Sequence, residues 1–446
     1  MQMMSSSRTP FRLSRIRVAP NRVAVALATL ATACVGSAEE NTPPPPPPQE
    51  NLPVQISLAT QHQGITGFGA SSAWTAPSLT DAEADQFFSP DTGIGLSLLR
   101  VRIAPGGTTD ELATAKSAAA RGVSVWAAPW SPPAEWKDNN STSNGGSLVP
   151  TQYQAWADRL AGFAAQMAAA GVPLKALSAQ NEPGYTAAWE TCVYQPAQLV
   201  VFIRDYLGPA LAGPALAGRR LPILAPETQN WNSFASFANP ILDDSESAKY
   251  VDFLATHDYG GTPYPYQAAG KEVWETEVSD PSKGSDPGID SGLVVAKMIH
   301  DHLVKADASA WHYWWLKPRM DSPPGNGALT GLDGQLTRRA YALGNWSRFV
   351  RPGFVRVDAT PNPQAWVYVS AFADPVSGRV VIVAVNQNIA DADQVFSIPG
   401  SGLSAVTPWI TSADLALAPA DPVPLVGESF TFTLPSSSIT TFVGDP

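Results

Sequence analysis

Between residues 64 and 345, short apolar runs alternate with longer segments in which apolar residues recur every three to four positions. The longer pattern is typical of amphipathic helices, as in Tyr153–Ala170 and Leu293–Lys305, and the short runs are typical of buried strands. The predicted strands are Gly67–Ala70, Leu96–Ile103, Val123–Pro129, Lys175–Asn181, Ile223–Pro226, Val251–His257, Glu272–Thr276 and Ala310–Trp315.

Eight predicted strands that alternate with helices favour parallel pairing through crossovers, and eight is the number that closes such a sheet into a barrel. A doubly wound open sheet is the alternative, but no glycine-rich phosphate loop follows the first predicted strand. The sequence therefore predicts an α/β fold, a (β/α)8 TIM barrel over residues 64–345.

After residue 346 the pattern changes to β-branched or alternating runs separated by turn residues, as in Trp366–Phe372, Val380–Asn386 and Phe430–Leu434. Such runs are typical of antiparallel strands, so residues 346–446 are predicted to form a side β-sandwich. The segment 52–63 contains the strand-like run Val54–Ala59, which we expect to pair with this C-terminal sheet.

The N-terminal residues 1–38 have the pattern of an export signal, because a basic stretch precedes an apolar run that is too short to span a bilayer. Small residues before Cys34 are typical of a bacterial lipoprotein processing site. Lipidation of Cys34, plain signal cleavage and a retained anchor are all open. The expected location is secreted or lipid-anchored at the cell surface. Residues 39–51 contain Pro43 to Pro48 and are predicted to be an extended linker.

Composition and charge limit the kinds of molecule that we expect this protein to bind. The formal net charge is −11, although five arginines stand in the first 22 residues, so a nucleic-acid partner is not expected. The 14 tryptophans are many for this length; most are expected to fill the core, and about a third could line a groove, since their flat apolar faces suit sugar rings. Only Cys192 remains beyond Cys34, so no disulfide framework is expected. We expect a monomer.

Two glutamates stand at predicted strand ends. The fourth strand runs into Gln180-Asn181-Glu182-Pro183, and the seventh ends at Glu277. Catalytic groups of such barrels lie at the carboxyl ends of the strands, and two carboxyl groups that flank a glycosidic bond are the usual apparatus for its hydrolysis. We therefore predict Glu182 as acid/base and Glu277 as nucleophile of a retaining mechanism.

The neighbouring residues allow further predictions. Glu275 competes with Glu277 for the nucleophile's place because strand alternation puts both on one face, but Glu277 lies nearer the strand end. Asn181 is predicted to donate to a sugar 2-hydroxyl. The five histidines show no clustered spacing, so neither a metal nor another cofactor is expected.

Several motifs together resemble glycoside hydrolase family 30, and most closely its subfamily 8, the glucuronoxylanases, over the chain from about residue 52 onward. They are Gly67-Phe68-Gly69, Ser131-Pro132-Pro133-Ala134-Glu135-Trp136-Lys137, Asn144-Gly145-Gly146-Ser147-Leu148, Gln180-Asn181-Glu182-Pro183, Trp314-Trp315 and Arg348-Phe349-Val350-Arg351-Pro352-Gly353.

This resemblance implies endo-cleavage of β-1,4-xylan, directed by a glucuronic acid branch, with retention at the anomeric carbon and no metal. It implies that Glu182 is the acid/base and Glu277 the nucleophile. The residues that it places against substrate are Trp74, Trp130, His257, Tyr259, Trp315, Ser282 and Arg319. Trp314 is expected to point away from Trp315 and to pack against a helix.

Arg319 matches the family's arginine that pairs with the glucuronate, and a guanidinium can bind a carboxylate through two hydrogen bonds. Ser279 and Asp321 stand near the positions where the family has tyrosines. Both a branch-directed enzyme and a plainer xylanase are therefore open. The other hypotheses are an endo-β-1,6-galactanase or β-1,6-glucanase of the same family, and a carbohydrate-binding lipoprotein without activity.

Overall fold

The computed structural model describes residues 51–446 apart from 76, 217, 281–285 and 319–326. The predicted export segment, Cys34 and the proline linker lie outside the described residues, and so do Ser282, Arg319 and Asp321.

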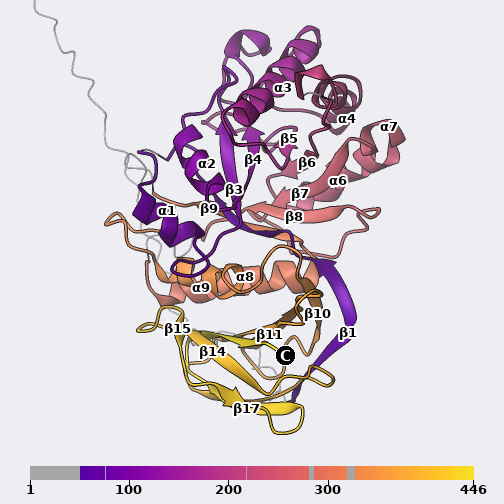
Figure 1. Cartoon of the computed structure of the whole chain (residues 1–446). Helices are drawn as coiled ribbons and strands as arrows, with labels where there is room; N and C mark the ends of the chain where they lie inside the picture. The colour runs from indigo at the N-terminus through magenta and orange to yellow at the C-terminus, as the bar shows by residue number, and fades with distance from the viewer. Residues whose placement is uncertain (1–50, 76, 217, 281–285, 319–326) are drawn as a thin grey trace, which may run out of the picture. The chain divides into compact units, whose positions relative to one another are not determined.

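Eight parallel strands close into a barrel in chain order, which confirms the predicted (β/α)8 architecture (Figure 1). The strands are β2 (Gly67–Ser71), β3 (Leu98–Ile103), β4 (Ser124–Pro129), β5 (Leu177–Ser178), β6 (Ile223–Thr228), β7 (Val251–His257), β8 (Glu272–Glu277) and β9 (Ala310–Trp315). Apolar side chains fill the barrel interior, among them Leu98, Trp126, Leu224 and Trp274. The barrel is thus a packed core whose carboxyl-end loops are left to build a site.

Strand β5 is much shorter than the predicted Lys175–Asn181. Its ladder covers only Leu177 and Ser178, although Asn181 N–H still donates to Pro129 O at 2.9 Å. Glu182 then adopts φ 47°, in the left-handed region that non-glycine residues rarely occupy. The chain therefore leaves the barrel wall just before Glu182, and this backbone turn places Glu182 at the mouth of the barrel.

Helices surround the barrel. Their N-termini carry local signals, such as the Thr80–Glu83 capping box before the first helix and the Asn230 side chain that accepts from Ser233 N–H. The α-helices are α1 (Asp81–Phe88), α2 (Leu112–Ala119), α3 (Tyr153–Ala169), α4 (Pro196–Phe202), α5 (Gly208–Leu211), α6 (Trp231–Asp243), α7 (Ser245–Ala248), α8 (Ile289–Lys305) and α9 (Arg338–Ser347). Short 3-10 turns cover Ala134–Trp136, Pro150–Gln152 and Pro214–Leu216, and a π-helical turn covers Ile203–Leu207.

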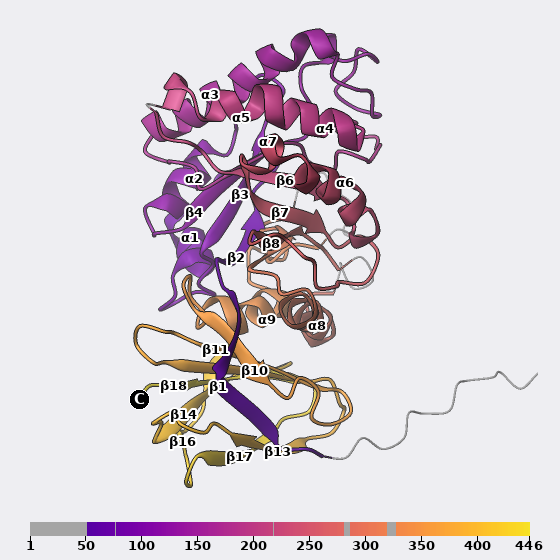
Figure 2. The same cartoon turned by 90° about the vertical axis from the view of Figure 1, so that its right-hand side faces the viewer.

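A ten-stranded sheet forms the side domain. Its strands are β1 (Val54–Gly64), β10 (Val355–Ala359), β11 (Val367–Ala373), β12 (Val380–Asn386), β13 (Ala392–Ser397), β14 (Ala405–Thr411), β15 (Ala418–Pro419), β16 (Val423–Pro424), β17 (Ser429–Leu434) and β18 (Ser438–Gly444). Strand β1 lies between β10 and β13, as Figure 2 shows for the indigo strand.

The sheet is mixed, whereas the sequence pattern predicts antiparallel strands throughout. The β1–β13 pair is parallel, because β1 enters from the far N-terminal end of the chain and no hairpin fixes its direction. The faces of the curled sheet enclose a separate apolar core in which Phe430 and Phe442 rings lie 5.0 Å apart.

Helices α8 and α9 connect the barrel to the side domain. Helix α8 packs on β11 and β12, and α9 contacts β2 of the barrel as well as β14 and β18 of the sheet. Buried polar groups fix this junction: Asn345 Nδ2 donates to Thr411 Oγ1 at 2.7 Å, and Thr441 Oγ1 donates to Asn345 Oδ1 at 2.9 Å. Among the described helices, none combines the length and apolarity that a membrane crossing requires.

Replacing Asn345 by alanine should therefore destabilise the fold. The change leaves the hydroxyls of Thr411 and Thr441 without this partner in a fully buried place, so the free energy of unfolding should fall by about 1–3 kcal/mol in a urea titration. The matched control is Gln166→Ala on the exposed face of α3, which should change stability little. Equal stability of the two variants would contradict a structural role for the Asn345 amide.

Candidate active site

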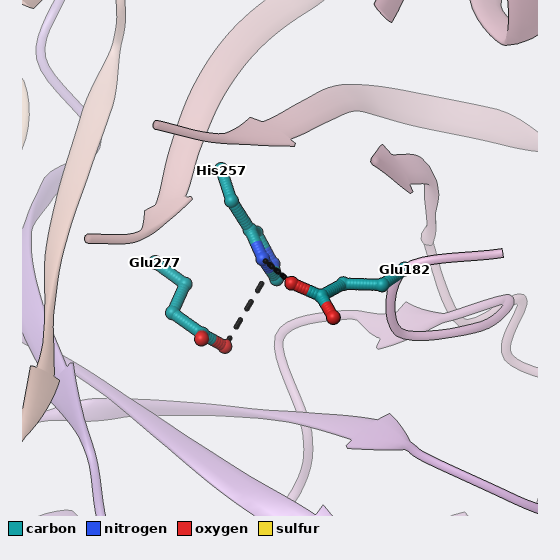
Figure 3. Close-up of side chains that lie close together, drawn as sticks. All are labelled: Glu182, His257 and Glu277. Carbon is teal, nitrogen blue, oxygen red and sulfur yellow. Dashed lines mark hydrogen bonds and ion pairs between the residues drawn. The ribbon is translucent and has the colours of Figure 1, made fainter. Parts of the chain in front are cut away.

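The predicted glutamates meet at the mouth of the barrel. Glu277 is the last residue of β8, and Glu182 follows β5 on the far side of the ring. Figure 3 shows their carboxyl groups converging with His257, from the end of β7. One ligand atom from each of the three residues lies within 4.8 Å of the others. Carboxyl groups this close fit the spacing of about 5–5.5 Å that retaining enzymes use, and not the wider gap of inverting ones.

Arg100, on β3, holds the carboxylate of Glu277 in place. Its Nη1 donates to Glu277 Oε2, and its Nη2 donates to Glu227 Oε1 at 2.7 Å and also to Asn181 Oδ1. The guanidinium has no exposed area, and its Cζ lies 4.4 Å from the ring centroid of Trp130. A cation buried this deeply is stable only because carboxylates and an aromatic face surround it.

His257 is the second cation of this cluster. Its Nδ1 lies 3.1 Å from Glu182 Oε1, and its Nε2 lies 3.5 Å from Glu227 Oε1 and 3.8 Å from Glu277 Oε2. Burial by itself lowers the pKa of His257, but the charge of Glu277 and the hydrogen bonds to Glu182 and Glu227 outweigh it and raise the pKa to about 10. The ring is therefore an imidazolium at neutral pH, and both nitrogens donate.

Charge balance decides which glutamate keeps a proton. Burial and the charge of Glu277 raise the pKa of Glu182, against the opposing effect of His257 and Arg100. Although burial alone would raise the pKa of Glu227, Arg100, His257 and Ser178 hold it below the ordinary value. With Glu182 protonated, two carboxylates face two cations and the buried cluster is neutral. The geometry thus makes Glu182 a proton donor.

The carboxylate of Glu277 is the better placed of the two acids on β8. Its Oε1 accepts from Tyr259 Oη at 2.9 Å and its Oε2 from Arg100. Glu275 has no exposed area, and its side chain accepts from the backbone N–H groups of Glu277 and His312 at 3.0 and 3.2 Å. Burial raises the pKa of Glu275 well above its usual range. Glu275 therefore supports the backbone beneath Glu277, away from solvent.

Asn181 and Tyr259 contact the same cluster. Because the Arg100 guanidinium can only donate, Asn181 Oδ1 must be the acceptor, which orients the amide so that its Nδ2 is the donating end. A donor beside Glu182 is what the predicted bond to a sugar 2-hydroxyl requires. Tyr259 contacts Glu277 directly, in addition to lining the mouth.

Aromatic rings form one group above the cluster. Trp74 lies 4.9 Å from Trp130 and 6.3 Å from Trp314, measured between ring centroids. The expectation that Trp314 packs against a helix is wrong. His312 points into the barrel, where it accepts from Trp126 Nε1 at 3.0 Å, and alternation turns Trp314 the same way. Trp315 stacks on Trp314 at 5.0 Å and is only 5% exposed.

Sequence reasoning missed Arg100, Glu227 and Trp314. Arg100 is a charged residue inside the apolar run Leu98–Ile103, and this anomaly marks a residue that needs buried partners. Glu227 was not recognised as a site residue because the fifth predicted strand ends at Pro226. In the structure the corresponding strand, β6, continues to Thr228.

Glu182, His257 and Glu277 also have the spacing of a metal site. In the structure the carboxylate of Glu277 already has protein partners, because it accepts from Arg100 at Oε2 and from Tyr259 at Oε1. Arg100 and His257 already supply the positive charge that a metal ion would bring to this cluster.

A closed parallel barrel with two facing carboxyl groups at its strand ends defines the class of the protein as a glycoside hydrolase. Residues 110–269 match the glycosyl hydrolase family 30 TIM-barrel domain. The chain is 33% identical to glucuronoxylanase XynC of Bacillus subtilis (strain 168) over 407 residues, which cover 87% of this chain and 91% of the relative.

Solved structures agree with this match. The family 30 subfamily 8 xylanase Xyn30A from Clostridium acetobutylicum is 36% identical, with a TM-score of 0.79 over 88% of this chain and all of that one. A family 30 endoxylanase from Clostridium papyrosolvens C71 is 33% identical, with a TM-score of 0.76 over the same shares. The chain belongs to glycosyl hydrolase family 30.

The charge balance predicts how the pKa of Glu182 responds to mutation. Replacing Glu277 by glutamine removes a negative charge that disfavours ionisation of Glu182, so the pKa of Glu182 should fall. A titration followed by NMR of 13C-labelled glutamate carboxyl groups measures this shift, and the exposed Glu135→Gln variant is the control. A pKa that stays constant or rises in Glu277→Gln would contradict the assigned coupling.

Proposed function

We propose that the protein is an endo-acting, retaining β-1,4-xylanase. The observation that carries the mechanism is the pair of carboxyl groups with one oxygen of each within 4.8 Å, of which Glu182 has a raised pKa and Glu277 accepts from Arg100. The substrate is proposed from the xylanases that the chain resembles over nearly its whole length.

In the first step Glu182 donates its proton to the glycosidic oxygen while Glu277 attacks the anomeric carbon from the opposite side of the sugar. A glycosyl ester on Glu277 results, and the leaving part of the chain departs as an alcohol. The negative charge of Glu277 is lost in this step, and Glu182, which is now ionised and lies 3.1 Å from His257 Nδ1, carries a negative charge beside that ring instead. Glu182 then removes a proton from the water that cleaves the ester, and the β configuration is kept.

The aromatic group suits the sugar on the nucleophile's side of the bond. Trp74, Trp130 and Trp314 contact one another, and the Arg100 guanidinium lies over the rings of Trp130 and Trp314. Asn181 would donate to the 2-hydroxyl of that sugar, an interaction that strengthens in the transition state.

A Glu182→Ala variant tests the assigned roles. Turnover of xylan should fall by about 10²–10⁴-fold, because the leaving oxygen is no longer protonated. On an aryl xylobioside, whose good leaving group departs without protonation, added azide should restore turnover and give a β-glycosyl azide, since this small anion attacks the ester of Glu277 without a general base. The products are identified by NMR. An α-configured azide, or full activity without azide, would contradict the double displacement.

The polymer and its branch are tested together. Wild-type enzyme should cleave glucuronoxylan and linear xylan in preference to β-1,6-galactan and β-1,6-glucan. Arg319→Ala should lower kcat/KM on glucuronoxylan at least about tenfold more than on linear xylan, because a charge-assisted bidentate pair is lost only with the acidic branch. Product ladders from each polymer measure the polymer preference and the effect of Arg319→Ala. A preference for a β-1,6 polymer would favour the alternative specificity, and equal losses on the two xylans would remove Arg319 from branch recognition.

We also propose that the enzyme acts outside the cell as a monomer, either free or attached through a lipidated Cys34. The support is the pattern of residues 1–38, in which a basic stretch precedes a short apolar run and small residues precede Cys34. An extracellular polysaccharide is too large to enter the cell and must meet the enzyme there.

A further inference from the structure

The loop that follows Glu182 carries an exposed aromatic pair. Trp189 is 54% exposed, an unusual state for the largest apolar side chain, and its ring centroid lies 6.4 Å from that of the half-buried Tyr185. The mechanism above uses neither ring. An exposed aromatic pair on an enzyme of polymers is a candidate for contact with substrate.

The loop is held firmly. Glu190, next to Trp189, forms a bidentate ion pair with Arg102 in which Nε donates to Oε2 at 2.9 Å. Asn144 N–H donates to Ala187 O at 2.8 Å, and Gly145 N–H donates to Thr191 Oγ1 at 2.8 Å. These bonds tie residues 183–191 to the loop after β4. The rings are therefore presented on a fixed support, which lowers the entropic cost of binding.

The pair lies beside the proton donor. Tyr185 N–H donates to Glu182 O at 3.0 Å, and the loops after β4 and β5 share the carboxyl end of the barrel with the site. In a retaining hydrolase the proton donor faces the leaving oxygen, whereas the nucleophile attacks from the opposite side. Residues that follow Glu182 directly therefore border the departing part of the polysaccharide.

The local charge also suits a neutral ligand. Arg102 neutralises Glu190, and its Cζ lies 5.0 Å from the ring centroid of Trp74, which joins the loop to the aromatic group at the mouth. Besides Trp189, the exposed residues of the loop are Gly184, Thr186 and Ala188, and none of them is charged. The C–H faces of β-linked pyranose rings are flat and apolar, and they pack on aromatic rings.

We propose that Tyr185 and Trp189 form a subsite that stacks on uncharged sugars of the leaving part of the chain. This inference rests on the proposed function, because endo-cleavage is what puts several sugars beyond the scissile bond. It adds a binding site on the side of Glu182. The substrate-binding residues predicted from sequence, in contrast, line the opposite side of the bond.

The test compares two substrates that differ only beyond the bond that breaks. Xylohexaose places sugars against the loop, whereas xylobiosyl β-fluoride has fluoride as its leaving group and places none there. Trp189→Ala should lower kcat/KM on xylohexaose roughly tenfold and leave the fluoride rate within about twofold, because only the stacking contact is lost. Trp189→Phe should keep most of the activity on xylohexaose.

The matched control is Trp366→Ala, which removes a 58% exposed tryptophan from the side domain and should alter neither rate. With hexaose labelled at its reducing end, Trp189→Ala should also shift the preferred cleavage position. Unchanged kcat/KM on xylohexaose, or equal losses on both substrates, would overturn the subsite.

The outcome for the subsite is separable from that for the proposed function. A wild-type enzyme that cleaves a β-1,6 oligosaccharide and not xylohexaose would refute the xylan assignment, and the same comparison of variants with that oligosaccharide would still decide the subsite. A wild-type enzyme that cleaves none of these substrates and no glucuronoxylan either would refute both.

Discussion

The site depends on the requirement that its buried positive and negative charges balance. Five ionisable side chains, Arg100, Glu182, Glu227, His257 and Glu277, are nearly sealed from water at the mouth of the barrel. Unbalanced charge is costly in such a place, because little solvent remains to stabilise it. Two cations can balance only two carboxylates, so one of the three acids must hold a proton. The contacts of Arg100 and the raised pKa of Glu182 assign that proton to Glu182.

The same constraint links the two halves of the reaction. Esterification of Glu277 removes one negative charge, and loss of the proton from Glu182 restores it, so the cluster is neutral before and after the step. His257 bonds to Glu182 and lies 3.8 Å from Glu277, and the charge of Glu277 is the first of the effects that raise its pKa to about 10 before the reaction. The backbone of Glu182 is held in a left-handed conformation to reach this position.

The sequence predicts the barrel well because its signals are local. Apolar runs and helical periodicity identify all eight strands, and the motif Asn181-Glu182-Pro183 together with the end of β8 identifies the two glutamates that meet at the barrel mouth. The side chains that contact these two acids could not be predicted from local patterns. Arg100 and Glu227 lie far from Glu277 in the chain, and only closure of the barrel brings them together. The parallel β1–β13 pair and the inward turn of Trp314 likewise depend on tertiary contacts that no local pattern encodes.

The central claim is that Glu277 forms the covalent bond to the sugar. The most direct measurement is mass spectrometry of the enzyme after reaction with a 2-fluoro-xylobioside that carries a good leaving group, because the fluorine slows breakdown of the ester. The account predicts one added glycosyl mass, located by peptide sequencing on Glu277. Attachment to Glu275 or Glu227, or complete turnover without any trapped ester under conditions where the native substrate is cleaved, would contradict it.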